Sequence, residues 1–164
     1  MNEEEFRKLG EEAELRFKEW LERHKIPYLY IQQDSDTFSS VFRYEDYGKR
    51  PDFIVLLPNF GFIFVDVKNK KLDSQYRNYC IDAKETRKYS SFQRKFNLQI
   101  WYVISNEDYD FKTWFWIPIS KVLESRIKKC TSNISGDDFY PISPEEFIQI
   151  SDSDSIYRIF SKDV

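Results

Sequence analysis

Residues that commonly build functional sites are scarce in this sequence. Its 164 residues include one histidine, two cysteines and four glycines. Cys80 and Cys130 lie far apart and form no C-x-x-C pair, so they predict neither a zinc site nor a disulfide framework. The glycines form no phosphate-binding loop, and no serine or cysteine stands in a nucleophile-elbow pattern. His24, between Arg23 and Lys25, suits the end of a helix better than a catalytic base.

Long apolar runs and a surplus of positive charge are also missing. The longest apolar runs are too short to span a bilayer. The N-terminal stretch MNEEEFRKL is acidic and has no apolar core, so it does not predict a secretory signal. We therefore expect a cytoplasmic protein without a membrane partner. The net charge of −3 neither favours nor excludes nucleic acid, so any affinity for phosphate must come from local clusters of lysine and arginine.

Apolar residues are plentiful enough for one folded domain, at 41% hydrophobic and 32% charged. Residue periodicity and turn residues predict helices over 2–24, 82–98 and 119–128, and strands over 28–32, 41–44, 51–57, 62–68, 100–104 and 114–117. A last helix is expected to begin at Pro144. This order predicts an α/β fold with a central mixed sheet flanked by helices. We expect a core domain over residues 1–130, with residues 131–164 packed on it as a C-terminal extension.

The predicted hairpin KRPDFIVLLPNFGFIFVDVKNKK carries three charged residues where an apolar pair of strands is expected. Asp66 and Lys68 project from the same face of their strand, because residues two apart share a face. In a hairpin that turns near Asn59, Asp52 meets Asp66. Two close carboxylates repel each other, which raises the pKa of one of them or requires a cation. A divalent metal meets that need, and with an adjacent ammonium it suits hydrolysis of a phosphodiester.

A simpler interpretation of the hairpin is that its charges have no shared function. Asp66 and Lys68 would then form a surface pair at an exposed strand end, and Asp52 would be a turn residue after Pro51. Short patterns of this kind also arise by chance. The position of the three residues in two adjacent strands favours the functional interpretation.

The hairpin resembles the PD-(D/E)XK nuclease superfamily, which has the restriction-endonuclease-like fold. Pro51-Asp52 matches its PD, and Asp66-Val67-Lys68 matches its (D/E)XK. A G-x-x-x-E pattern like that of Holliday junction resolvases is present on the first predicted helix, with Gly10 followed by Glu14. A small residue at Gly10 would allow the sheet to approach the helix closely. The resemblance covers roughly residues 5 to 120 and implies the order αβββαβ for the core.

The resemblance implies a magnesium or manganese site and assigns roles to its residues. Asp52 and Asp66 would bind the metal directly, with the backbone carbonyl of Val67 as a further ligand. Lys68 would position or activate the attacking water. Glu14 would bind the metal directly or through water.

Contacts to the nucleic acid are expected from the helix after the hairpin and from the lysines near it. The candidates for these contacts are Gln93, Lys84, Lys95 and Lys70, with Gln75 as a rival to Gln93 for a polar position near the site. A Q-x-x-x-Y motif, which marks one subgroup of the superfamily, is absent at Gln93 because Asn97 follows it by four residues.

We therefore predict a metal-dependent endonuclease that cuts DNA and acts as a homodimer. Junction-resolving, restriction, mobile-element and phage-defence roles all agree with the sequence, and so does an RNA substrate. The alternative is an inactive nuclease-like domain that binds nucleic acid or a protein. Such domains usually lose an acidic residue or the lysine, and the sequence retains them all. A third interpretation is a purely structural domain with carboxylates placed by chance.

Overall fold

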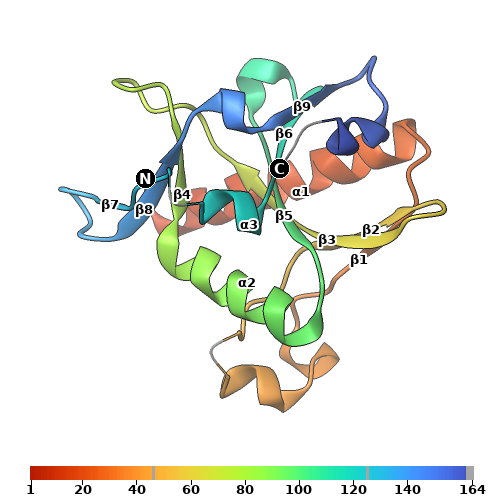
Figure 1. Cartoon of the computed structure of the whole chain (residues 1–164), viewed down its shortest axis with the longest axis horizontal. Coiled ribbons are helices and arrows are strands. Elements are labelled where there is room, and N and C mark those ends of the chain that lie inside the picture. Colours follow the sequence, from red (N-terminus) through yellow and green to blue (C-terminus); the bar gives the residue numbers. More distant parts are fainter. Residues whose placement is uncertain (46, 125, 162–164) are drawn as a thin grey trace.

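A six-stranded mixed sheet forms the centre of the protein in the computed structural model, which describes residues 1–45, 47–124 and 126–161. The strands lie in the order β1-β2-β3-β5-β6-β9 (Figure 1). Their bounds are β1 Tyr28–Tyr30, β2 Phe53–Leu57, β3 Gly61–Asn69, β5 Ile100–Ser105, β6 Thr113–Pro118 and β9 Ile148–Ser151. Strands β3 and β5 pair in parallel, and helix α2 (Ala83–Phe96) lies in the connection between them. The other neighbouring strands are antiparallel.

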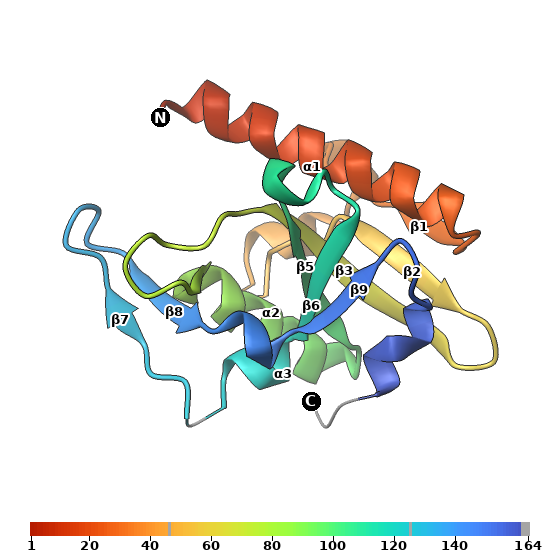
Figure 2. The same cartoon turned by 90° about the horizontal axis from the view of Figure 1, so that it is seen from above.

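Helix α1 (Glu3–Arg23) covers one face of the sheet, and α2 with the short α3 (Ile119–Val122) covers the other (Figure 2). Asn2 and Glu5 start α1 with a reciprocal capping box. The buried residues of α1 recur at helical spacing and pack on the sheet; they are Ala13, Phe17, Trp20 and Leu21. A second apolar cluster, rich in aromatic rings, fills the space between the sheet and α2. The predicted arrangement of a mixed sheet between helices is confirmed.

A smaller sheet lies beside α2, at one end of the molecule (Figures 1 and 2). Its strands are β4 (Tyr79–Asp82), β8 (Asp138–Ile142) and β7 (Cys130–Thr131), all antiparallel and in that order. Residues beyond 131 therefore contribute β8 to this sheet and β9 to the central one. None of the helices in the described part of the chain is long and apolar enough to cross a membrane.

Several local predictions were wrong. Residues 40–43 form a 3-10 turn instead of the strand expected over 41–44. The helix expected over 119–128 ends after one turn, at Val122. Pro144 begins another 3-10 turn, and the chain then enters β9 instead of a helix. Strands β4 and β8 were missed, because each is short and depends on a partner distant in the sequence.

Candidate active site

The two aspartates of the hairpin converge where β2 begins. The β2–β3 ladder pairs Phe53 with Val65, and the amide of Asp52 continues it by donating to the Val65 carbonyl at 2.9 Å. Asp52 Oδ2 then accepts a hydrogen bond of 2.7 Å from the amide of Val67. This contact places Asp52 beside the segment that carries Asp66, and both carboxylates are buried. The geometry expected from the hairpin is present.

Burial dominates the ionisation of both carboxylates. It raises the pKa of Asp52, and the charges of Asp66 and Glu14 raise it further. Burial also raises the pKa of Asp66, although the nearby Lys68 lowers it in part. Both groups therefore bind protons more readily than an exposed aspartate. A cation that enters between them would stabilise the charged forms.

Lys68 lies between two carboxylates. Its ammonium is 2.7 Å from Asp66 Oδ2 and 2.7 Å from Glu85 Oε1, and the Glu85 carboxylate also lies 3.5 Å from the Lys49 ammonium. Burial lowers the pKa of Lys68, but Asp66 and Glu85 raise it more, so the net pKa lies above the usual value. Burial raises the pKa of Glu85, but Lys68 and Lys49 lower it more, so Glu85 stays ionised at neutral pH. Lys68 is therefore a cation held in place by α2.

Tyr89, one helical turn after Glu85, holds the other oxygen of Asp66. Its hydroxyl donates to Asp66 Oδ1 and lies 3.2 Å from the carbonyl oxygen of Arg50. Burial and the nearby Asp66 charge raise the pKa of Tyr89, so the phenol keeps its proton and remains a donor. Asp66 is thus oriented from two sides, by Tyr89 and by Lys68.

Glu14 reaches the site from α1. It is half-buried and accepts a hydrogen bond of 2.6 Å from the Tyr30 hydroxyl. Burial raises the pKa of Glu14, Tyr30 lowers it, and the charge of Asp66 raises it again, which indicates that the two carboxylates interact. The expectation that Gly10 permits close packing was wrong, because a Cβ at Gly10 would have no atom within 4 Å. Leu9 makes the contact instead, since its carbonyl accepts from the Asn69 side chain at 2.9 Å.

The oxygen donors at this site suit a hard divalent ion. The three carboxylates Glu14, Asp52 and Asp66 line one cleft of about 810 Å³. The Val67 carbonyl points to the same side of β3 as the Val67 amide, which is toward Asp52, because both groups of a strand residue face one neighbour. Within residues 1–45, 47–124 and 126–161, no three His, Cys, Asp or Glu side chains gather into a complete metal site. Mg²⁺ fits these oxygen donors, because it needs few protein ligands and fills the rest of its shell with water and phosphate.

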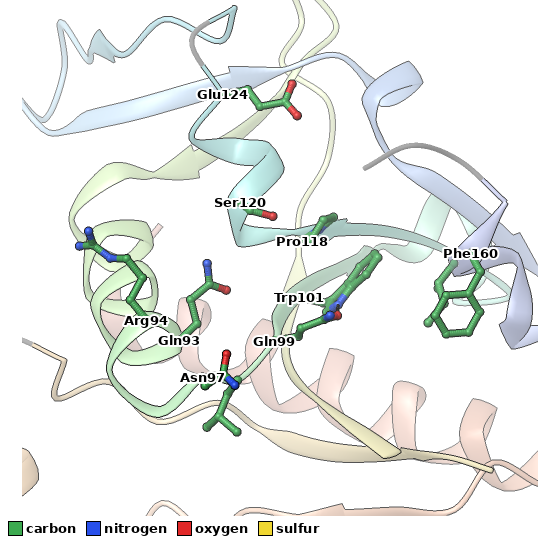
Figure 3. A pocket seen from close by; sticks show the side chains of 11 residues that line it. Gln93, Arg94, Asn97, Gln99, Trp101, Pro118, Ser120, Glu124 and Phe160 are labelled. Carbon is green, nitrogen blue, oxygen red and sulfur yellow. Dashed lines mark hydrogen bonds between the residues drawn. The ribbon is translucent and has the colours of Figure 1, made fainter. Parts of the chain in front are cut away.

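The structure separates the expected nucleic-acid contacts. Lys70 lines the cleft beside Lys68, and its pKa is lowered by burial and by the Lys68 charge. Gln93 is directed elsewhere: it lines a second cleft of about 850 Å³ at the C-terminal end of α2, together with Asn97 and Trp101 (Figure 3). The expectation that Gln93 lies near the site was therefore wrong, and the polar residue of α2 at that place is Glu85.

The remaining candidates lie on the surface. Lys84 and Lys95 are exposed, and the Lys95 ammonium is 5.9 Å from the centre of the Tyr47 ring. Gln75 is exposed in the loop before β4, where its backbone N–H donates a hydrogen bond to the Asp73 carboxylate. None of these three side chains is among those that line the carboxylate cleft in the described structure.

Glu85 and Tyr89 are the site residues that the sequence interpretation missed. They stand four residues apart, so they lie on one face of α2 and reach the site together. The signal was present as an E-x-x-x-Y spacing just after the Asp82 N-cap. Gln93, two turns further along the helix, is also polar, and the sequence alone does not show whether Glu85 or Gln93 faces the site.

Comparison with known proteins supports the fold. No protein-family model matches the chain, and no curated protein matches it. The solved structures that are similar include Hjc of Archaeoglobus fulgidus, a Holliday junction resolvase, at 12% identity and a TM-score of 0.53 over 87% of this chain and 95% of that one. D212, a nuclease from a fusselovirus, is 12% identical with a TM-score of 0.44 over 81% of this chain and 77% of that one. The restriction-endonuclease-like fold expected from the sequence is confirmed by the similarity to Hjc.

Proposed function

We propose that the chain is a metal-dependent endonuclease that hydrolyses phosphodiester bonds of DNA. The observation that carries this proposal is the buried pair of Asp52 and Asp66, next to the Lys68 ammonium and open to a cleft that Glu14 also lines. Burial of two neighbouring carboxylates destabilises a fold, so their presence is best explained by a function. A hydrolytic metal site is the purpose that best explains the combination, and the fold shared with Hjc agrees with it.

Asp52 and Asp66 would hold the metal, with the Val67 carbonyl as a further ligand and Glu14 as a ligand through water or directly. We expect Mg²⁺ or Mn²⁺, because the donors are all oxygens. When bound, such an ion polarises the phosphate and lowers the pKa of a bound water. Tyr89 would keep Asp66 turned toward the cleft, because its hydroxyl holds Oδ1 of that carboxylate.

Lys68 acts in this proposal as a positioned cation instead of a general base. Its pKa lies above that of an ordinary lysine, so the side chain carries no free lone pair at neutral pH. The ammonium would orient the attacking water and stabilise the negative charge that grows on the phosphate oxygens. Glu85 would hold Lys68 in the place where it does this.

Lysine side chains around the site are the proposed contacts to the phosphate backbone of the nucleic acid. Lys70 is the strongest, because it lies in the cleft itself. Lys84, Lys95 and Gln93 remain predicted contacts for a longer nucleic acid that extends over α2. We further propose that the protein is cytoplasmic and acts as a homodimer, which would supply two sites for a substrate with two strands to cut.

An inactive, binding-only domain is the alternative, and one observation favours it. Lys68 already compensates Asp66 and Glu85 in the structure, at 2.7 Å from each. A site closed by such ion pairs is stable without a metal, as expected of a domain that no longer cuts.

Cleavage assays separate the two functions. Supercoiled, linear, single-stranded and four-way-junction DNA are incubated with Mg²⁺ or Mn²⁺, and Asp52→Asn, Asp66→Asn and Lys68→Met are tested in parallel. The nuclease proposal expects cutting that all three variants lose. Lys112→Met is a matched control, since Lys112 is an exposed lysine paired with Asp110. Cutting that survives Asp66→Asn would contradict the proposed site.

Metal binding is measured separately from cutting. A rise in Tm with Mg²⁺ or Mn²⁺, weakened in Asp52→Asn, is expected if the carboxylates hold the ion. A binding-only domain with a closed site would show no such rise.

A further inference from the structure

The cleft that contains the carboxylates has two walls of different character. One wall is Met1 with the N-terminal half of α1, from which Phe6, Leu9, Gly10, Glu12 and Glu14 line the cleft. The other wall is the end of β3 and the residues just after it, which include Lys68, Lys70 and Lys71. The cleft volume of about 810 Å³ lies in the range of small-ligand pockets. It therefore has room for a few nucleotides of one strand.

All the lysines of the cleft lie outside α1, where the carboxylates Asp52, Asp66 and Glu107 also line it. Lys70 lies on the β3 wall, and within the described part of the chain no carboxylate is within ion-pair distance of its ammonium. Lys71 forms an ion pair with Glu107 at 2.6 Å, so Lys70 is the better placed of the two lysines to bind a phosphate. The α1 wall contributes Glu12 and Glu14 and no basic residue. A phosphate backbone would therefore lie on the β3 wall, away from α1.

The α1 wall offers a surface for bases instead. Phe6 is 62% exposed and faces no aromatic partner in the described structure, although most other phenylalanines pack against a ring. Gly10 lies one helical turn after Phe6, inside α1, where alanine would stabilise the helix more than glycine does. A Cβ there would meet no atom within 4 Å, so packing within the protein does not require glycine. Because Gly10 has no side chain, the cleft is wider between Phe6 and Glu14.

We propose that this cleft binds an unpaired stretch of a nucleic-acid strand, with its bases toward Phe6 and Gly10 and its phosphates toward Lys70. This inference rests on the proposed nuclease function and names its substrate class. An exposed aromatic ring next to a basic track is a common design for single strands, since every base can stack. A second, paired strand would bring its phosphates against the acidic first turns of α1, which disfavours duplex DNA in the cleft.

Binding without turnover tests the inference. Fluorescence anisotropy with a labelled oligothymidylate, and with a duplex of the same length, is measured in EDTA so that no strand is cut. We expect the single strand to bind more tightly than the duplex. Phe6→Ala should weaken binding of the single strand about 5- to 160-fold, the range for loss of one base stack. Gly10→Leu should weaken it as well, because leucine suits the helix but fills the space.

Matched variants identify the cause of any loss. Phe60→Ala removes a phenylalanine that is 67% exposed at the opposite end of β3, and its binding should equal that of the wild type. Lys70→Ala should reduce the slope of log affinity against log salt by about one phosphate contact. Equal binding of duplex and single strand, or an unchanged affinity in Phe6→Ala, would overturn the inference.

The same proteins are then assayed for cutting in Mg²⁺ or Mn²⁺. Cutting of duplex DNA that is unaffected by Phe6→Ala would refute this inference and leave the nuclease proposal standing. Binding of single strands that depends on Phe6, without cutting of any substrate, would support the inference and refute the nuclease proposal.

Discussion

Replacement of Lys68 by methionine tests whether this lysine holds the site together. In the folded protein its ammonium compensates Asp66 and Glu85, at 2.7 Å from each. The side chains of these two acids are 3% and 17% exposed, so solvent screens them poorly. Lys68→Met keeps the length of the stem but leaves Asp66 without its ion-pair partner and leaves Glu85 with the Lys49 ammonium alone, at 3.5 Å.

The expected cost follows from the burial. Loss of one partner of a buried ion pair destabilises a fold by about 3–5 kcal/mol. The lower end applies here, because the Lys68 side chain is 22% exposed. For a domain of this size, about 3 kcal/mol corresponds to a fall in Tm of roughly 6 to 12 °C. Urea unfolding at neutral pH, followed by circular dichroism, measures the same loss at fixed temperature.

The pH dependence of this loss gives its physical cause. Without Lys68, the folded-state pKa of Asp66 rises further above its unfolded value. A carboxyl with a raised folded-state pKa destabilises the protein as the pH rises through that pKa, because the buried group then becomes charged. At low pH, where the group is protonated in both states, it does not destabilise the protein. The gap between Lys68→Met and the wild type should therefore be largest at neutral pH and shrink on acidification. Adding Glu85→Gln should recover part of the loss, since it removes one of the two carboxylates that Lys68 compensated.

The matched control is Lys71→Met, because Lys71 forms ion pairs with Glu107 and Asp108 at the surface. Its loss should be much smaller, as is usual for exposed pairs. The reasoning is refuted if Lys68→Met costs no more than Lys71→Met, or if its cost is the same at acidic and neutral pH.

Three further substitutions separate stability from activity. Asp52→Asn should abolish cutting and raise the free energy of unfolding at neutral pH. The gain should grow with pH, because the raised pKa of Asp52 makes its charged form unfavourable in the folded protein. Urea titrations at several pH values would show the opposite trend if the carboxylate were stabilising. Tyr89→Phe should cost about 1–3 kcal/mol, because it leaves Asp66 Oδ1 buried without its donor; unchanged urea unfolding would argue against that hydrogen bond. Gly10→Ala should stabilise the protein by about 0.5–1 kcal/mol, since its Cβ meets no atom and alanine favours the helix, and a lower Tm would contradict this.

The sequence by itself determined the parts of the site that are close together along the chain. Asp52 and Asp66 are joined by a hairpin whose turn residues and strand length set their register, so their meeting follows from local geometry. Lys68 follows on the same face for the same reason. The long helix at the N-terminus was also predicted, because its apolar residues repeat at helical spacing over many turns.

Only the tertiary structure decided which side chain of α2 reaches the site. The crossover between the parallel strands β3 and β5 sets the position of this helix, and it brings Glu85 and Tyr89 to the carboxylates while Gln93 faces another cleft. Strands β4 and β8 likewise exist through a pairing between segments far apart in the chain. Such contacts depend on how whole elements pack, and residue periodicity carries information only about the face of each element.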